Sequence, residues 1–144
     1  MSANGLEVFD TTVQKANGWL KDIMSSLGWA ERERAYLALR TTLHALRDRL
    51  TVDEVAQRGA QLPMLVRGIY YEGWNPGDTP PSAVRHREEF LARIALVFGT
   101  DDAESVASAV FGVLSHRISE GEIADVRQAL PAEIRELWQP QATV

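Results

Sequence analysis

A segment in the middle of the chain recurs near its C-terminal end, and the two copies align without a gap at an offset of 68 residues. Seven identical pairs fall in one 25-residue window, where unrelated sequences of ordinary composition would share about one or two. The identical pairs are Leu46/Leu114, Arg49/Arg117, Glu54/Glu122, Ala56/Ala124, Leu62/Leu130, Pro63/Pro131 and Arg67/Arg135. A duplication of this kind constrains the fold strongly, because both copies must form the same supersecondary unit.

Similar residues continue upstream at an offset of 71. The pairs are Trp19/Phe90, Leu20/Leu91, Ile23/Ile94, Leu27/Phe98 and Gly28/Gly99. The first copy therefore contains three extra residues between Gly28 and Ala35 (71 − 68 = 3), and such an insertion is best tolerated in a loop or at a helix start. We expect a first repeat over about residues 6–74, a Gly- and Pro-rich loop over 73–82 and a second repeat over about 83–138.

Apolar residues recur at steps of three and four, which is the period of one helix face. This spacing predicts a helix over Leu6–Leu27 that stops at Gly28, and a second helix from about Glu31 to Leu50. No stretch shows the alternation of a strand bounded by turn residues. The sequence therefore predicts an all-α fold: one domain over residues 1–144, a compact bundle of about eight helices from two pseudo-symmetric four-helix repeats.

Capping residues indicate the other helix boundaries. Thr51 and Glu54 form a capping-box pattern at the start of the third helix, and Ser119 and Glu122 repeat it at the seventh. Pro63 and Pro131 suit the first position of the fourth and eighth helices, which are predicted to end near Glu72 and Trp138. The expected caps of the fifth and sixth helices are Ser82 and either Asp101 or Asp102.

Composition restricts the classes of function. The chain has no cysteine, which excludes disulfides, a thiolate nucleophile and cysteine metal ligands. The net charge of −5 disfavours nucleic-acid binding, which draws on a basic surface. The sequence contains no apolar run as long as the ~20 residues of a membrane span. Its N-terminus does not resemble a signal peptide, so we expect a cytoplasmic protein without membrane association.

Three sequence stretches resemble a known family. They are AQLPMLVRGIYYEGW, HRISEGEIADVRQALPAEIRELW and WLKDIMSSLG, and they are similar to the uncharacterised bacterial family called domain of unknown function 2267. The resemblance extends from about Phe9 to Trp138. It implies a helical fold of duplicated halves and a mainly bacterial, cytoplasmic setting. It implies no activity, cofactor or catalytic residue.

The candidate binding residues are Tyr70, Tyr71, Glu72, Trp74 and Asn75. They lack a full counterpart in the second repeat, so the shared fold does not account for them. Tyr and Trp beside a loop can form a recognition surface, because they offer a large contact area at a small entropic cost. The alternative, which we favour, is that Tyr70 and Trp74 anchor the loop onto the core.

Other polar residues have simpler interpretations. His44, His86 and His116 fit no metal-binding spacing, which favours lone surface or interface histidines and no metal site. Glu31, Glu33, Glu88 and Glu89 are expected to be solvated. The repeated arginines, Arg49, Arg67, Arg117 and Arg135, are interpreted as architectural, placed to interact with helix C-termini or with Glu54 and Glu122. An anion-binding quartet is the alternative.

No catalytic residue and no cofactor is assigned from the sequence. We expect a non-enzymatic protein-interaction or scaffold domain, whose partner is another protein or a second copy of the chain. The alternative is binding of a small molecule or lipid in the groove between the two repeats. A nucleic-acid role ranks third. An enzyme ranks last, although a catalytic site dispersed over several helices would leave no local motif.

Overall fold

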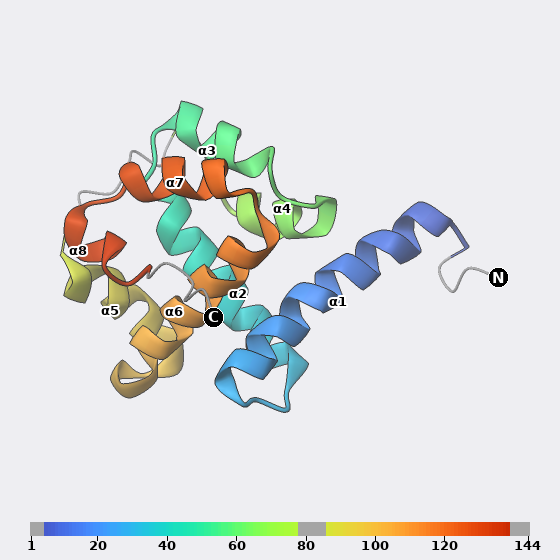
Figure 1. The fold of residues 1–144 in the computed structure, drawn as a ribbon, viewed down its shortest axis with the longest axis horizontal. Coiled ribbons are helices and arrows are strands. Elements are labelled where there is room, and N and C mark those ends of the chain that lie inside the picture. Colours follow the sequence, from blue (N-terminus) through green and yellow to red (C-terminus); the bar gives the residue numbers. More distant parts are fainter. Residues whose placement is uncertain (1–4, 78–85, 139–144) are drawn as a thin grey trace.

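A computed structural model of the chain describes residues 5–77 and 86–138. These residues form eight α-helices and no strand, which confirms the all-α prediction (Figure 1). The helices are α1 (Glu7–Leu27), α2 (Arg32–Arg47), α3 (Val52–Gly59), α4 (Met64–Tyr71), α5 (Arg87–Phe98), α6 (Thr100–Arg117), α7 (Glu120–Gln128) and α8 (Ala132–Arg135).

Several predicted helix boundaries are confirmed by the local geometry. α1 ends at Gly28, which has a φ of 67°, a left-handed conformation that glycine adopts without a Cβ clash. At the start of α3, the Thr51 hydroxyl accepts from the Glu54 N–H and the Glu54 carboxylate accepts from the Thr51 N–H. At α7, the Ser119 hydroxyl accepts from the Glu122 N–H, but the Glu122 carboxylate pairs with Arg58, so the predicted second capping box forms only in part.

Other boundaries were predicted wrongly. The regular part of α2 ends at Arg47, and three-residue turns carry the chain on to the buried Leu50. Turns of the same kind extend α8 to Trp138. Neither Asp101 nor Asp102 caps α6, because Gly99 occupies the N-cap and both acids lie in the first helical turn. Ser82, the expected cap of α5, lies outside the described residues.

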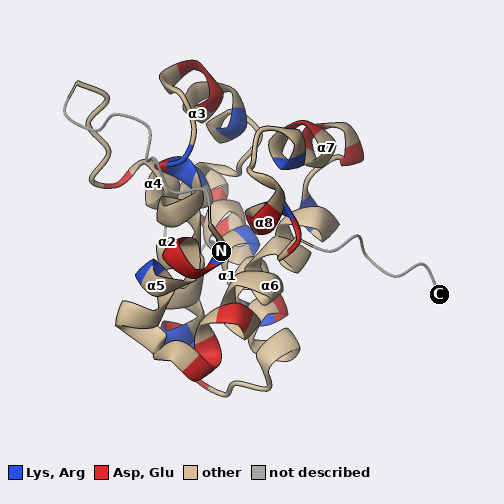
Figure 2. Cartoon of the chain, turned by 90° about the vertical axis from the view of Figure 1, so that its left-hand side faces the viewer, with Lys and Arg blue, Asp and Glu red and all other residues tan. Residues whose placement is uncertain are grey.

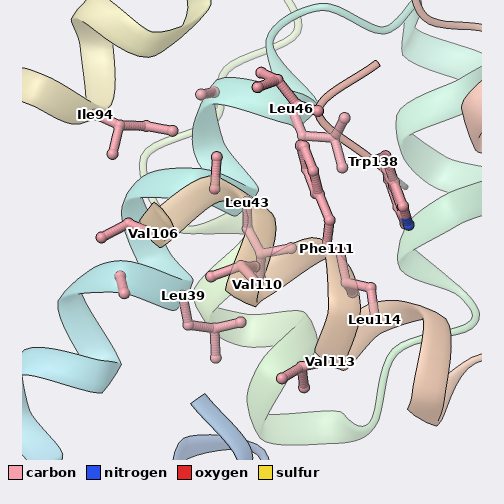
Figure 3. Packing of buried hydrophobic residues seen from close by; sticks show 14 of the residues in the cluster. Leu39, Leu43, Leu46, Ile94, Val106, Val110, Phe111, Val113, Leu114 and Trp138 are labelled. Atoms are coloured by element: carbon pink, nitrogen blue, oxygen red, sulfur yellow. The ribbon is translucent and has the colours of Figure 1, made fainter. Parts of the chain in front are cut away.

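Helices α2 and α6 lie at the centre of the molecule. α1 packs on α2 and α6, and α5 packs on the same two helices. Leu39 and Leu43 of α2 share a core with Val110 and Phe111 of α6 (Figure 3). The Phe111 ring stacks on the Trp138 ring, with the ring centroids 4.5 Å apart. The first helix of each half therefore contacts the second helix of the other half. The pseudo-twofold relation between the halves stays a prediction.

Two arginines at equivalent sequence positions make matching contacts. Arg67 donates from Nη2 to the Leu62 carbonyl at 2.8 Å, and Arg135 donates from Nη2 to the Leu130 carbonyl at 2.8 Å. Arg67 also reaches Ala60, and Arg135 reaches Arg127 and Gln128. The Ala60 and Leu62 carbonyls follow the end of α3, and the Arg127, Gln128 and Leu130 carbonyls lie in the last residues of α7 or just after them. A helix end leaves such carbonyls without intrahelical partners. Both arginines thus serve the helix ends, in line with the architectural interpretation.

The predicted carboxylate partners of the arginines are partly wrong. Arg117 pairs with Asp22 of α1, with Nε and Oδ2 2.6 Å apart. Glu122 instead pairs with Arg58, and this contact joins α3 to α7. Glu54 is engaged in its capping box. The paired residues are far apart in the sequence and come together only because their helices pack. A local sequence pattern therefore could not predict these pairs.

The N-terminal half of α1 projects away from the other helices (Figure 1). In the view of Figure 2, acidic and basic residues are interspersed over the molecule. Within the described residues, no helix combines the length and apolar character needed to cross a bilayer.

Candidate functional site

Tyr70, the first of the predicted binding residues, is part of the core. Its side chain is 2% exposed, and its hydroxyl donates to the Val55 carbonyl of α3 at 2.9 Å. Burial raises the pKa of the Tyr70 phenol above its usual range. The ring therefore fixes α4 against α3, which agrees with its predicted anchoring role.

Tyr71 and Trp74 extend this aromatic contact toward the surface. The Tyr71 ring packs edge-on against the Tyr70 ring, with their centroids 5.0 Å apart. The centroid of the Trp74 ring lies 5.6 Å from that of Tyr71. Tyr71 also covers Gly59, where its Cζ lies 2.7 Å from the position that a Cβ would take. Both Tyr71 and Trp74 are half-buried, whereas Asn75 is exposed. The segment thus presents only part of its aromatic area to solvent.

Side chains of α2 hold the carbonyls at the end of α4. His44 Nε2 lies 2.7 Å from the Ile69 carbonyl, and because a carbonyl only accepts, Nε2 must carry the proton. Arg47 donates from Nη1 to the Tyr70 carbonyl at 2.8 Å and to the Glu72 carbonyl at 3.0 Å. These contacts satisfy carbonyls that a helix end leaves without partners.

Charged groups complete this contact between α2 and α4. Arg47 is 4% exposed, and its Nε donates to Asp48 at 2.8 Å, while Asp48 also pairs with Arg93 of α5 at 2.6 Å. Despite its burial, the pKa of Asp48 is lowered, because both guanidinium groups favour the carboxylate. Glu72 pairs with Arg40 at 2.8 Å. Of the predicted binding residues, Glu72 therefore takes part in holding α4 on α2.

The three histidines lie apart, and one of them differs from the prediction. His86 and His116 are exposed, as expected, but His44 is buried. Burial lowers the pKa of His44, so the neutral ring is favoured. In the part of the chain that the structure describes, no three His, Asp or Glu side chains form a group suited to a metal. Glu31, Glu33, Glu88 and Glu89 are exposed, as predicted.

The apolar cavity between the two halves is small, whereas a larger hollow of about 530 Å³ lies between α1 and α6. Leu46, Leu62, Tyr70, Leu114 and Trp138 are among the side chains around a cavity of about 30 Å³. A volume of this size holds one or two water molecules. Arg58 and Glu122, which pair with each other, also line it.

A different apolar surface lies on the projecting half of α1, and its exposure was not predicted. We call residues 6–15 the arm. Leu6 is 49% exposed, Phe9 is 53% exposed and Val13 is 41% exposed. Phe9 and Val13 are four positions apart and share one side of the helix, and Leu6 is the N-cap residue of α1. We call these three residues the arm face. Its periodicity was the available signal, but the sequence suggested a buried face.

The arm face continues into a groove between α1, α2 and α4. This groove has a volume of about 320 Å³ and is lined by Val13, Leu20, Tyr36, Leu65 and Ile69, together with Ala16, Asn17 and Leu39. Leu65 and the neighbouring Met64 are themselves exposed on α4. We call it the arm groove. An apolar ridge and an apolar groove thus lie next to each other on one side of the molecule.

Comparison with known proteins supports a family assignment. A family model described as "Uncharacterized conserved protein (DUF2267)" matches residues 16–137. A search of curated proteins found no match. The matched region includes the α2–α4 contact and begins at Ala16, directly after the arm.

Proposed function

The chain belongs to the uncharacterised conserved family DUF2267, and within that family we propose that this protein is a protein-interaction or scaffold domain. The observation that carries the proposal is the exposed arm face beside the arm groove. Apolar residues grouped on a projecting helix are typical of an interaction surface. The proposed setting is the bacterial cytoplasm, which the family resemblance suggests.

An amphipathic helix binds through side chains at spacings of three and four residues, which enter an apolar groove. The arm face has this spacing at Leu6, Phe9 and Val13. Phe9 is the expected anchor, because aromatic side chains dominate the binding energy of many interfaces. Binding of a small molecule or lipid between the repeats has less support, since the apolar cavity there is only about 30 Å³ and the larger hollow between α1 and α6 is lined in part by Ser26, Asp102 and Ser105.

A capture experiment with the full chain tests this proposal. Wild-type protein, Phe9→Glu and Leu96→Glu are immobilised, and proteins captured from host lysate, including the chain itself, are measured by mass spectrometry. Leu96 is a matched control, because it is an exposed apolar residue on α5. We expect Phe9→Glu to abolish capture of the partner and Leu96→Glu to retain it. The same captured set for all three proteins would contradict the proposal.

The aromatic segment is the second proposed surface, and the half-buried Trp74 beside the exposed Asn75 supports it. Trp74→Ala removes ring area at the surface, whereas Tyr71→Ala also disturbs the contact with Gly59. Loss of a partner in the Trp74 variant, with the fold retained by circular dichroism, would favour this surface. If both variants keep every partner, the segment is not a binding site.

A further inference from the structure

We propose that the arm face binds a second copy of this chain, with the two α1 helices antiparallel and crossing at Val13. This inference rests on the proposed function and names its partner. The first reason is the apolar spacing along α1 and its N-cap residue. Leu6, Phe9, Val13, Ala16, Leu20, Ile23 and Leu27 follow one another at alternating steps of three and four. That spacing is the apolar seam of a coiled coil.

The seam is covered over only part of its length. Ala16 and Ile23 are buried against the protein's own core, whereas Leu6, Phe9 and Val13 are exposed. The family match begins at residue 16. The arm therefore precedes the matched region, and the protein's own core leaves its apolar face exposed.

The ridge and the groove on one chain are complementary to each other. In an antiparallel pair that crosses at Val13, residues that lie level with each other along the two helices have numbers that sum to 26. Leu6 of one copy therefore lies level with Leu20 of the other. Leu20 lines the arm groove together with Leu65 and Ile69. The arm of each copy thus extends along the groove of the other. An arrangement of this type is isologous and closes as a dimer.

The charges along α1 favour the antiparallel direction. Glu7 and Asp10 lie in the arm, while Lys15 and Lys21 lie farther along the helix. An antiparallel pair that crosses at Val13 places Glu7 and Asp10 of one copy beside the part of the other helix between Lys15 and Lys21. A parallel pair would instead place acid beside acid and lysine beside lysine, which is unfavourable.

Sedimentation velocity over a range of concentrations tests self-association. The expected species has twice the 16.0 kDa mass of the chain. Phe9→Glu should raise the dimer dissociation constant by roughly 100-fold, as for loss of an interface anchor, and Leu96→Glu should leave it unchanged. Circular dichroism checks that each variant keeps its helices. A dimer that is unaffected by Phe9→Glu overturns the inference.

Disulfide trapping tests the direction, since the chain contains no cysteine of its own. Val13→Cys should form a disulfide-linked dimer under mild oxidation, because the two residues meet at the twofold axis. Leu6→Cys alone should not, but a mixture of Leu6→Cys and Leu20→Cys should form the mixed dimer. Efficient linkage of Leu6→Cys to itself would show a parallel pair and overturn the inference.

The two proposals fail differently. A wild-type chain that stays monomeric, yet captures another protein through Phe9, overturns self-pairing and leaves the interaction proposal standing. A monomeric chain whose captured proteins do not depend on Phe9 overturns both.

Discussion

Arg58 of α3 donates a hydrogen bond to Glu122 of α7, and this ion pair joins the third helix of one half to the third helix of the other. The two side chains are only 16% and 19% exposed. Removal of one partner leaves the other charge in a partly desolvated position. We expect Glu122→Gln to lower the free energy of unfolding by roughly 1–3 kcal/mol, measured by urea denaturation with a single transition.

The pair of Arg34 and Asp102 provides the control. Its closest atoms are 3.7 Å apart and its side chains are 42% and 55% exposed. Exposed pairs contribute about 0–1 kcal/mol, so Asp102→Asn should change stability less than Glu122→Gln. Equal effects would show that Arg58 and Glu122 do not contribute beyond a surface pair.

Arg67 and Arg135 should stabilise the protein by comparable amounts, since each binds carbonyls after the end of a helix. Arg67→Met and Arg135→Met are each expected to lower the unfolding free energy by about 1–2 kcal/mol, measured by thermal and urea denaturation. Arg32→Met in the exposed first turn of α2 is the control. Unchanged stability together with loss of a binding partner would instead support the anion-binding alternative.

Gly59 should not tolerate alanine while Tyr71 is present. Alanine normally stabilises a helix by about 1 kcal/mol relative to glycine, but here its Cβ would overlap the Tyr71 ring. We expect Gly59→Ala to destabilise the protein by roughly 1–3 kcal/mol, as overpacking does. In a Tyr71→Ala background the same substitution should be neutral or stabilising, and a double-mutant cycle measures this coupling.

Gly68 is the matched control for this experiment, because nothing lies within 4 Å of the position of its added Cβ. Gly68→Ala should stabilise α4 by roughly 0.5–1 kcal/mol. Stabilisation by Gly59→Ala in the wild-type background would contradict the proposed overlap with Tyr71.

His44 should make stability depend on pH. Its pKa is lowered from 6.5 in the folded protein, mainly by burial. The unfolded chain therefore binds a proton that the folded chain resists, and stability is lost as the pH falls below 6.5. The slope from this residue can reach about 1.4 kcal/mol per pH unit. Denaturation at a series of pH values measures it.

The His44→Gln variant tests the assignment, because a glutamine amide can still donate to the Ile69 carbonyl but does not titrate. It should flatten the acid-induced loss of stability below pH 6.5. His116→Gln, at an exposed position on α6, should retain that loss. If both variants behave as wild type, another group causes the pH dependence.

Much of the fold could be predicted from the sequence, because its determinants are local. Periodic apolar residues gave α1, and Thr51 with Glu54 gave the start of α3. The start of α6 was missed because Gly99, with a φ of 87°, occupies the N-cap without a side chain. The predicted ends of α2 and α8 lie beyond the observed ends. Tight turns follow each helix and keep Leu50 and Trp138 at positions that continue the apolar pattern of the helix.

The candidate site was less predictable, because its contacts are long-range. Nothing near His44 in the sequence indicates that its ring meets the Ile69 carbonyl of α4. The sequence favoured an anchoring role for Tyr70, but it did not show that the hydroxyl would meet the Val55 carbonyl of α3. For the arm, periodicity showed that Leu6, Phe9 and Val13 share a face, but it cannot show what covers that face.

The stacking of Trp138 on Phe111 has a consequence for synthesis of the chain. A ribosome makes the first half long before it reaches Trp138, and until then Leu43, Leu46 and Tyr70 have no complete second half to cover them. Nascent chains with exposed apolar surface are prone to aggregate and are typical chaperone clients. Closure of the core therefore waits until the segment that carries Trp138 has been made.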